Sequence, residues 1–232
     1  MDSFLGKYWN NREMARRTLY AAFGLNVVGT GDIYLVKKST DADYEEWLRM
    51  FPSANIFTTI TLAQAACTAS KGDIVVIAPG SYSEALTIDK AGVRYIGLGA
   101  SPYETVINGA GSICATITGL NVRFENLRFL TTGAAIVNIY GTGLVGAPVI
   151  DNCDFTQIEL TSLACIQIAG ATTRGLRVTN CNFLGASGSA DAVNAAGKQA
   201  FIMNNTAEDL NTTEATCFGS TSYHTGSSNL AV

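Results

Sequence analysis

The chain has 232 residues, 47% of them hydrophobic and 15% charged, which suits one large domain with some appended structure. Its formal net charge of −4 argues against a nucleic-acid partner, because such a partner requires a basic stripe. No apolar run approaches the ~18–20 residues that span a bilayer, and the N-terminus lacks the apolar core of a secretory signal. We therefore expect no membrane partner and synthesis in a reducing cytoplasm, where the six cysteines remain thiols.

Residues 1–55 are the first of three expected segments and are interpreted as a docking or capping segment. Within residues 1–30, aromatic and aliphatic side chains fall at i, i+4 spacing with basic side chains between them, which predicts a short amphipathic helix. Such a helix either packs on the body of its own chain or docks onto a virion partner. The candidate docking residues are Phe4, Tyr8, Trp9, Arg12, Arg16 and Arg17.

A strand is expected over residues 32–36, followed by a short helix from Asp43 to Met50 that Pro52 stops. Residues 61–70 are typical of a second helix, with Thr61 as its N-cap and Gly72 just past its end. A helix in this place would close the open end of a repetitive core. The core itself is expected over residues 56–210, and a polar tail, loosely ordered or ordered by a partner, over residues 211–232.

A tetrapeptide recurs along the second half of the chain: Asn126-Leu-Arg-Phe129, Asn152-Cys-Asp-Phe155 and Asn180-Cys-Asn-Phe183, with a degenerate copy at Asn205-Thr-Ala-Glu208. The asparagines are 26, 28 and 25 residues apart. A second marker, apolar-x-Gly, recurs in step, as at Ile117-Thr-Gly119 and Ile139-Tyr-Gly141. Self-similarity at such a period is typical of a solenoid. Because the units are short β-type runs, we expect an all-β fold in which each repeat is one coil of a single-stranded parallel β-helix.

Each repeated asparagine is expected at a bend between two sheets, where its side chain can satisfy backbone groups and bond to the next coil. The expected ladder comprises Asn126, Asn152, Asn180 and Asn205, with Phe129, Phe155 and Phe183 stacked inward just after it. Cys153 and Cys181 fall in the inward slot that Leu127 and Thr206 hold in other coils. We interpret these two cysteines as small core residues rather than redox groups.

Alternation of side chains along a strand assigns an inward and an outward face to each coil. One sheet presents a polar outward column that comprises Thr116, Asn138, Gln167 and Asn194. An apolar outward column comprises Cys114, Ile136, Cys165 and Ala192, with Val149 and Ile202 outward on the neighbouring sheet, where Phe201 and Met203 point inward. Exposed apolar stripes usually contact another surface, here either the chain's own termini or a second subunit. A threefold bundle of solenoids would bury the stripe, so we expect a homotrimer.

Asp151 and Asp154, with Glu125 one coil away, are the nearest approach to a pair of catalytic carboxylates. One interpretation is a glycosidase-like acid pair, whose carboxyl groups would stand ~5–9.5 Å apart. The other is a surface ladder in which Arg128 pairs with Asp154, since adjacent coils lie ~4.8 Å apart. We favour the ladder, because no aromatic platform for a sugar ring accompanies the acids. The single histidine, His224, lies in the polar tail, and no cluster has metal-ligand spacing, so we expect neither a metal nor another cofactor.

Residues 31–110 carry a further signature, which includes Gly31-Asp-Ile-Tyr-Leu-Val36, Lys71-Gly-Asp-Ile-Val-Val-Ile-Ala-Pro-Gly80 and Ala91-Gly-Val-Arg-Tyr-Ile-Gly-Leu-Gly99. It resembles the first coils of right-handed parallel β-helix proteins of the pectin-lyase-like superfamily, and looks most like structural proteins of tailed bacteriophages. The resemblance covers roughly residues 31–205. The catalytic motifs of polygalacturonase-like and pectin methylesterase-like enzymes do not occur in the sequence, so no catalytic residue is carried over to any position.

The resemblance implies a non-enzymatic virion structural protein, such as a capsid decoration or cement protein of a tailed phage. Such a protein would lie on the virion surface with the major capsid protein or another virion protein as its partner, and glycans are a further expected ligand. Two alternatives use the same fold. One is a tailspike-like carbohydrate-active enzyme that uses Asp151, Asp154 and Glu125, and the other is a glycan-binding adhesin that presents the polar column.

Overall fold

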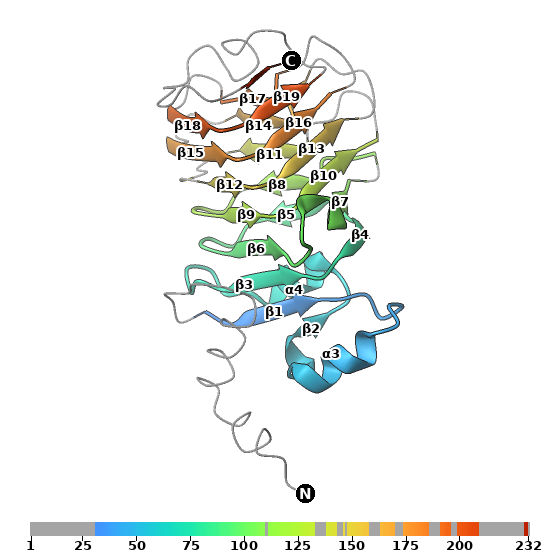
Figure 1. Cartoon of the computed structure of the whole chain (residues 1–232). Coiled ribbons are helices and arrows are strands. Elements are labelled where there is room, and N and C mark those ends of the chain that lie inside the picture. Colours follow the sequence, from blue (N-terminus) through green and yellow to red (C-terminus); the bar gives the residue numbers. More distant parts are fainter. Residues whose placement is uncertain are drawn as a thin grey trace, which may run out of the picture.

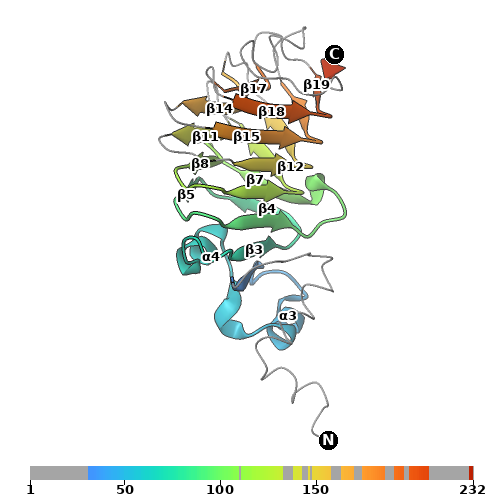
Figure 2. The ribbon, with the colours of Figure 1, turned by 90° about the vertical axis from the view of Figure 1, so that its left-hand side faces the viewer.

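The computed structural model describes residues 31–109, 111–132, 138–142, 146, 148–157, 163–169, 174–185, 191–195, 199–208 and 230–231. Within these residues, parallel strands form three sheets that stack along one axis (Figures 1 and 2). From β3 to β19 the chain visits the sheets in a fixed rotation, first sheet A, then sheet B, then sheet C. A chain that returns to the same three parallel sheets once in every coil is a parallel β-helix, so the expected fold class is confirmed.

The bounds of the strands follow the repeat. Sheet A comprises β1 (Ile33–Val36), β2 (Ile56–Phe57), β3 (Ile74–Ile77), β6 (Arg94–Gly97), β9 (Arg123–Glu125), β12 (Val149–Asp151), β15 (Arg174–Thr179) and β18 (Gln199–Met203). Sheet B comprises β4 (Gly80–Ser83), β7 (Thr105–Asn108), β10 (Arg128–Thr131), β13 (Asp154–Gln157), β16 (Asn182–Leu184), β19 (Thr206–Glu208) and β20 (Leu230–Ala231). Sheet C comprises β5 (Leu86–Ile88), β8 (Ala115–Ile117), β11 (Ile139–Thr142), β14 (Ile166–Ala169) and β17 (Val193–Asn194).

The core is built from inward side chains that lie in register from coil to coil. Phe129, Phe155 and Phe183 form a stack, with ring centroids 5.2 and 4.8 Å apart and interplanar angles of 8° and 9°. Tyr95 stacks on Phe124 at 5.2 Å in the same interior. All five rings are fully buried. Offset or stacked aromatic pairs add to the free energy of burial, so these columns hold successive coils in one register.

The bend between sheets A and B requires left-handed backbone. Asn126, Asn152, Asn180 and Asn204 have φ values of 53°, 49°, 56° and 57°. Asparagine tolerates this region because its short side chain can bond locally. The side chains also bond between coils: Asn152 Nδ2 donates to Asn126 Oδ1 at 3.0 Å, and Asn204 Nδ2 lies 3.4 Å from Asn180 Oδ1.

The last rung of the ladder is therefore Asn204, and the expected Asn205 is wrong by one residue. Asn205 is fully buried in the slot of Cys153 and Cys181, where its Oδ1 accepts from Cys181 N at 2.8 Å. Thr206 accordingly lies outside that slot, opposite Asn182. The sequence permits the error because two asparagines adjoin, and only one can take the left-handed position.

Two short helices cover the lower end of the stack in Figure 1. α4 (Ile60–Ala66) lies at the free edge of sheet C, where Gln64 Nε2 donates to Thr87 O of β5. Its Ile60 and Ala63 side chains join the core. The N-cap is Thr59, whose hydroxyl accepts from Leu62 N at 3.2 Å, and not the expected Thr61.

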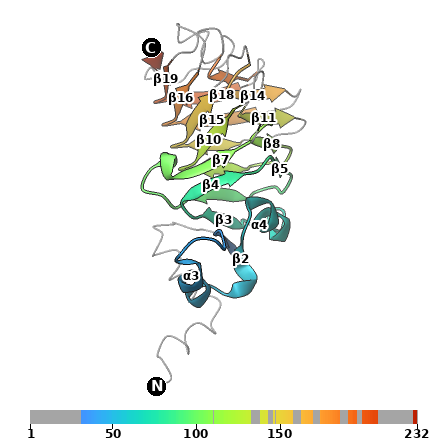
Figure 3. The ribbon, with the colours of Figure 1, turned by 90° about the vertical axis from the view of Figure 1, so that its right-hand side faces the viewer.

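The other helix, α3 (Tyr44–Met50), packs outside sheet A (Figure 3). Its Tyr44, Trp47 and Leu48 side chains lie against a second apolar cluster that includes Leu35 and Val76. Because β1 and β3 carry apolar residues on both faces, they need this outer cover. β1 joins sheet A although it falls within the first of the three expected segments, residues 1–55. Among the described helices, none is long and apolar enough to cross a membrane.

Candidate functional site

The outward face of sheet C carries a column of polar side chains. The strand register places Thr87, Thr116, Tyr140, Gln167 and Asn194 on successive coils of β5, β8, β11, β14 and β17. Side chains at corresponding positions of adjacent strands lie ~4.8 Å apart along the stack. The result is a straight row that runs parallel to the axis of the β-helix.

The predicted column lacks Thr87 and has a different residue from this row at one further rung. Asn138 is fully buried, and its Nδ2 donates to Phe129 O at 3.0 Å and Thr156 O at 3.2 Å. Tyr140 holds the outward place instead, because Ile139 pairs with Ala115 rather than with Ile117. The apolar-x-Gly marker therefore misaligned this coil by two residues. A shift of two residues leaves Ile139 facing inward, as predicted, but the outward residue beside Thr116 is Tyr140 instead of Asn138.

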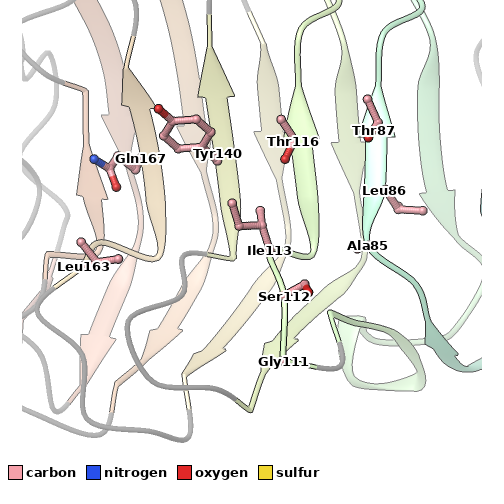
Figure 4. Close-up of a pocket in the computed structure, with 10 residues that line it drawn as sticks. All are labelled: Ala85, Leu86, Thr87, Gly111, Ser112, Ile113, Thr116, Tyr140, Leu163 and Gln167. Carbon is pink, nitrogen blue, oxygen red and sulfur yellow. The ribbon is translucent and has the colours of Figure 1, made fainter.

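A groove lies over the row (Figure 4). It has a volume of about 580 Å³, and it is lined by Ala85, Leu86, Thr87, Gly111, Ser112, Ile113, Thr116, Tyr140, Leu163 and Gln167. In Figure 4, Thr116, Tyr140 and Gln167 come from neighbouring strands, while Ser112, Ile113 and Leu163 come from the chain that leads into β8 and β14. The floor is thus polar with one aromatic ring, and two aliphatic side chains lie at the margin.

The polar groups of the groove are available to a ligand. Within the described part of the chain, no hydrogen bond joins the side chains of Thr87, Thr116, Tyr140, Gln167 or Ser112 to another residue. Donors and acceptors that project into a concave surface without protein partners are the arrangement by which binding sites orient small polar ligands. This groove is accordingly the best candidate site in the described structure.

The sequence contained a signal for one of the two residues that the predicted column omitted. Leu86-Thr87-Ile88 shows the same apolar–polar–apolar alternation as Ala115-Thr116-Ile117, and it therefore identifies Thr87 as outward. For Tyr140 the alternation by itself is ambiguous, because only the pairing of Ile139 with Ala115 and Ile166 sets its place.

The expected carboxylate pair lies elsewhere and is divided between two sheets. Asp151 ends β12 of sheet A, and its Oδ1 accepts from Thr179 Oγ1 at 2.6 Å and from Asn180 Nδ2 at 2.9 Å. Glu125 lies beside it in β9, ion-paired with Arg94 and Arg123. These acids form a ladder of hydrogen bonds and ion pairs on the outside of sheet A.

Asp154 begins β13 of sheet B and is only 2% exposed. Its carboxylate contacts Arg128 Nε at 3.1 Å and accepts from Thr156 Oγ1 at 3.0 Å and Asn182 Nδ2 at 3.1 Å. The tyrosine of the short turn η2 (Pro102–Glu104), Tyr103, stacks on the Arg128 guanidinium at 5.0 Å. The pKa of Tyr103 is raised because its hydroxyl donates to the Asp154 carboxylate. Asp154 is thus covered and fully engaged in bonds.

The expected apolar outward column is contradicted by the structure. Cys114, Cys165 and Ala192 are fully buried members of the core. Each directly precedes another buried residue, because the chain turns a corner as it enters sheet C and the alternation of faces is interrupted there. Burial raises the pKa of the Cys114 thiol to about 12. Ile136 lies outside the described residues.

On sheet A the error has a different cause. Ile202 is fully buried, whereas Phe201 and Met203 are partly exposed, because β18 pairs through Val178 with Ile202. The one-residue error at Asn205 had inverted this strand, as any one-residue shift of register does. Val149 is partly exposed as expected. The apolar stripe is therefore absent from the described surface, and the argument for a homotrimer that rested on it is lost.

The remaining expected sites receive no structural test. The docking residues Phe4, Tyr8, Trp9, Arg12, Arg16 and Arg17, together with His224 in the tail, lie outside the described residues. Within the described ranges, no group of three or more His, Cys, Asp or Glu side chains is placed to hold a metal ion.

Comparison with solved structures finds pectin methylesterases. The chain is 13% identical to pectin methylesterase PemA from Erwinia chrysanthemi, covering 79% of this chain and 80% of that one, with a TM-score of 0.41. The enzyme from Yersinia enterocolitica is 14% identical over 67% and 81% of the two chains, with a TM-score of 0.43. The deglycosylated enzyme from Aspergillus niger is 14% identical over 88% and 85%, with a TM-score of 0.37.

No protein-family model matches the chain, and no curated protein matches its sequence. At 13–14% identity the likeness concerns the fold and extends to no activity. The sheet topology therefore shows a parallel β-helix and no particular family.

Proposed function

We propose that this chain is a non-enzymatic structural protein of a tailed-phage virion, most simply a decoration protein on the capsid surface. The resemblance of residues 31–110 to phage structural proteins supports the virion assignment. The observation that supports a non-enzymatic role is the state of the outward carboxylates. Asp151, Asp154 and Glu125 are each bonded within a ladder, on two different sheets, and none of them lines the groove of sheet C.

Ladder acids of this kind stabilise the coil rather than activate water. A glycosidase needs two carboxyl groups on either side of one glycosidic bond. Asp151 and Asp154 instead flank the Asn152 bend and belong to two different sheets, A and B. Attachment to the virion would use the N-terminal segment with its basic and aromatic residues.

The test combines a catalytic assay with a particle-binding assay. Purified chain is incubated with host polysaccharides and methyl-esterified pectin, and released reducing ends and methanol are measured. It is also co-sedimented with capsids of the encoding virus, with Trp9→Ala and Arg16→Glu as variants. We expect no product, co-sedimentation of the wild type, and loss of binding in the variants. Cleavage that disappears in Asp151→Asn or Asp154→Asn would establish the enzyme instead, and failure to bind any particle would remove the virion role.

The groove favours a second function, glycan binding by the same non-catalytic chain. Tyr140 supplies the aromatic ring whose absence counted against a sugar site at the aspartates, and it lies in a groove with Thr116 and Gln167. An aromatic face packs against the C–H face of a pyranose ring, while hydroxyl and amide groups bond to its hydroxyls. An array of immobilised glycans probed with labelled chain tests this function. Binding that Tyr140→Ala removes supports it, and a blank array refutes it.

A further inference from the structure

We propose that the groove on sheet C selects uncharged glycans and holds the glycan chain parallel to the axis of the β-helix. This inference rests on the glycan-binding function proposed above and specifies the class of ligand. It follows from the charge of the lining, the direction of the polar row and the contrast between sheet C and the other two sheets.

Among the described residues that line the groove, none carries a charge at neutral pH. The described residues around it are aliphatic, hydroxyl-bearing, amide-bearing, aromatic or glycine. A uronate or sulfate group placed there would leave water without a cation to replace its hydration, which is strongly unfavourable. The formal charge of −4 on the whole chain adds a long-range repulsion toward polyanions. An uncharged sugar hydroxyl meets neither this loss of ionic hydration nor the repulsion.

Three arginines of the described β-helix lie on the other two sheets. Arg94 and Arg123 lie on the outside of sheet A, where both pair with Glu125. Arg128 lies on the outside of sheet B, between Asp154 and Tyr103. These arginines thus take part in ladders on sheets A and B, whereas the described row on sheet C consists of neutral polar side chains.

The row of polar groups sets the orientation of the ligand. Thr87, Thr116, Tyr140 and Gln167 lie on four successive strands, and at ~4.8 Å per strand the row is ~14 Å long. A ligand that meets one side chain from each coil must therefore extend along the axis. A linear oligosaccharide of a few rings has this form, since it repeats its hydroxyls at each ring.

Tyr140 would be the main contact, with polar neighbours on both sides. Its ring lies between Thr116 of β8 and Gln167 of β14, and Leu163 and Ile113 border the groove. A sugar ring stacked on the tyrosine would put its equatorial hydroxyls within reach of the flanking hydroxyl and amide groups. Aromatic side chains in the centre of a binding site typically contribute more than tenfold to affinity.

The experiment uses the full chain and hexasaccharides of equal length. Isothermal titration measures binding of the hexamers of neutral glucans, xylans and mannans, and of oligogalacturonate, at low and high salt. We expect at least one neutral hexamer to bind at least tenfold more tightly than oligogalacturonate, with an affinity that does not change with salt. Tyr140→Ala should weaken this binding at least tenfold. Tyr103→Ala is the matched control, because Tyr103 is an exposed tyrosine (53%) of η2, outside the groove, and this change should leave the affinity unchanged.

A variant that adds a positive charge to the groove distinguishes glycan binding itself from the selectivity for uncharged glycans. Gln167→Lys should raise the affinity for oligogalacturonate several-fold and make it fall with salt, because it supplies the missing cation. Oligogalacturonate that binds the wild type as tightly as the neutral hexamers would overturn the selectivity while glycan binding stands. No binding of any hexamer would overturn both. Neutral binding that survives Tyr140→Ala would place the site elsewhere and refute the inference.

Discussion

Replacing Phe155 by alanine tests the core on which every other feature depends. The ring is fully buried and lies between Phe129, 5.2 Å away, and Phe183, 4.8 Å away. A Phe→Ala change in a core costs ~3–5 kcal/mol through lost transfer free energy and the cavity that remains. Because both stacked neighbours lose a partner, we expect a value near the upper end, ~4–5 kcal/mol.

The assay is urea denaturation followed by circular dichroism. With a slope of ~1–3 kcal/mol per molar, a loss of this size lowers the midpoint by more than ~1 M. Phe201→Ala is the matched control, since that ring is partly exposed on the outside of β18, with Arg177 at 4.8 Å from its centre. It should cost less than ~1 kcal/mol. A loss below ~1 kcal/mol for Phe155→Ala, or equal losses for both variants, would refute the assignment of faces.

Three further predictions concern the bend, a buried thiol and the covered aspartate. Asn152→Ala should destabilise by ~1–2 kcal/mol in the same assay and Asn152→Gly by less, because φ is 49° there; equal losses would argue against backbone strain as the cause. The ordinary pKa of a thiol, 9.0, is raised to about 12 at Cys114, so the folded state keeps a proton that the unfolded state releases, and stability should fall as pH rises from 9 to 12. Cys114→Ala should make this fall shallower, and an unchanged slope would assign it to other groups. Asp154→Asn should lower the pKa of Tyr103 in an ultraviolet titration, because the carboxylate that raises it is removed; an unmoved titration would show that the two groups are not in contact in solution.

The sequence alone determined the fold and most of its inner surface. In each repeat a phenylalanine follows an asparagine by three residues. This pattern indicated a coil with a bend at the asparagine and an inward stack of rings, and Phe129, Phe155 and Phe183 form such a stack. These features are local, since a left-handed bend favours asparagine and an inward position favours an aromatic ring wherever they occur. Alternation within one strand then fixes the neighbouring faces.

The sequence failed where two neighbouring residues could fill one role. Asn204 and Asn205 both suit a bend, and the choice of Asn205 inverted the faces of β18 and placed Ile202 outside. The corner before sheet C also defeated the alternation, so that Cys114 was expected at the surface although it is buried. Alternation applies inside a strand and ends where the chain turns.

Only the tertiary structure decided the groove. Tyr140 reaches the row of Thr116 and Gln167 because β11 pairs with β8 and β14 in one register out of several that its apolar residues permit. That register is set by hydrogen bonds between strands more than twenty residues apart and by the packing of the core beneath them. A sequence pattern reports which side of its own strand a residue occupies, whereas its neighbours on adjacent coils depend on pairing, and a binding surface is made of such neighbours.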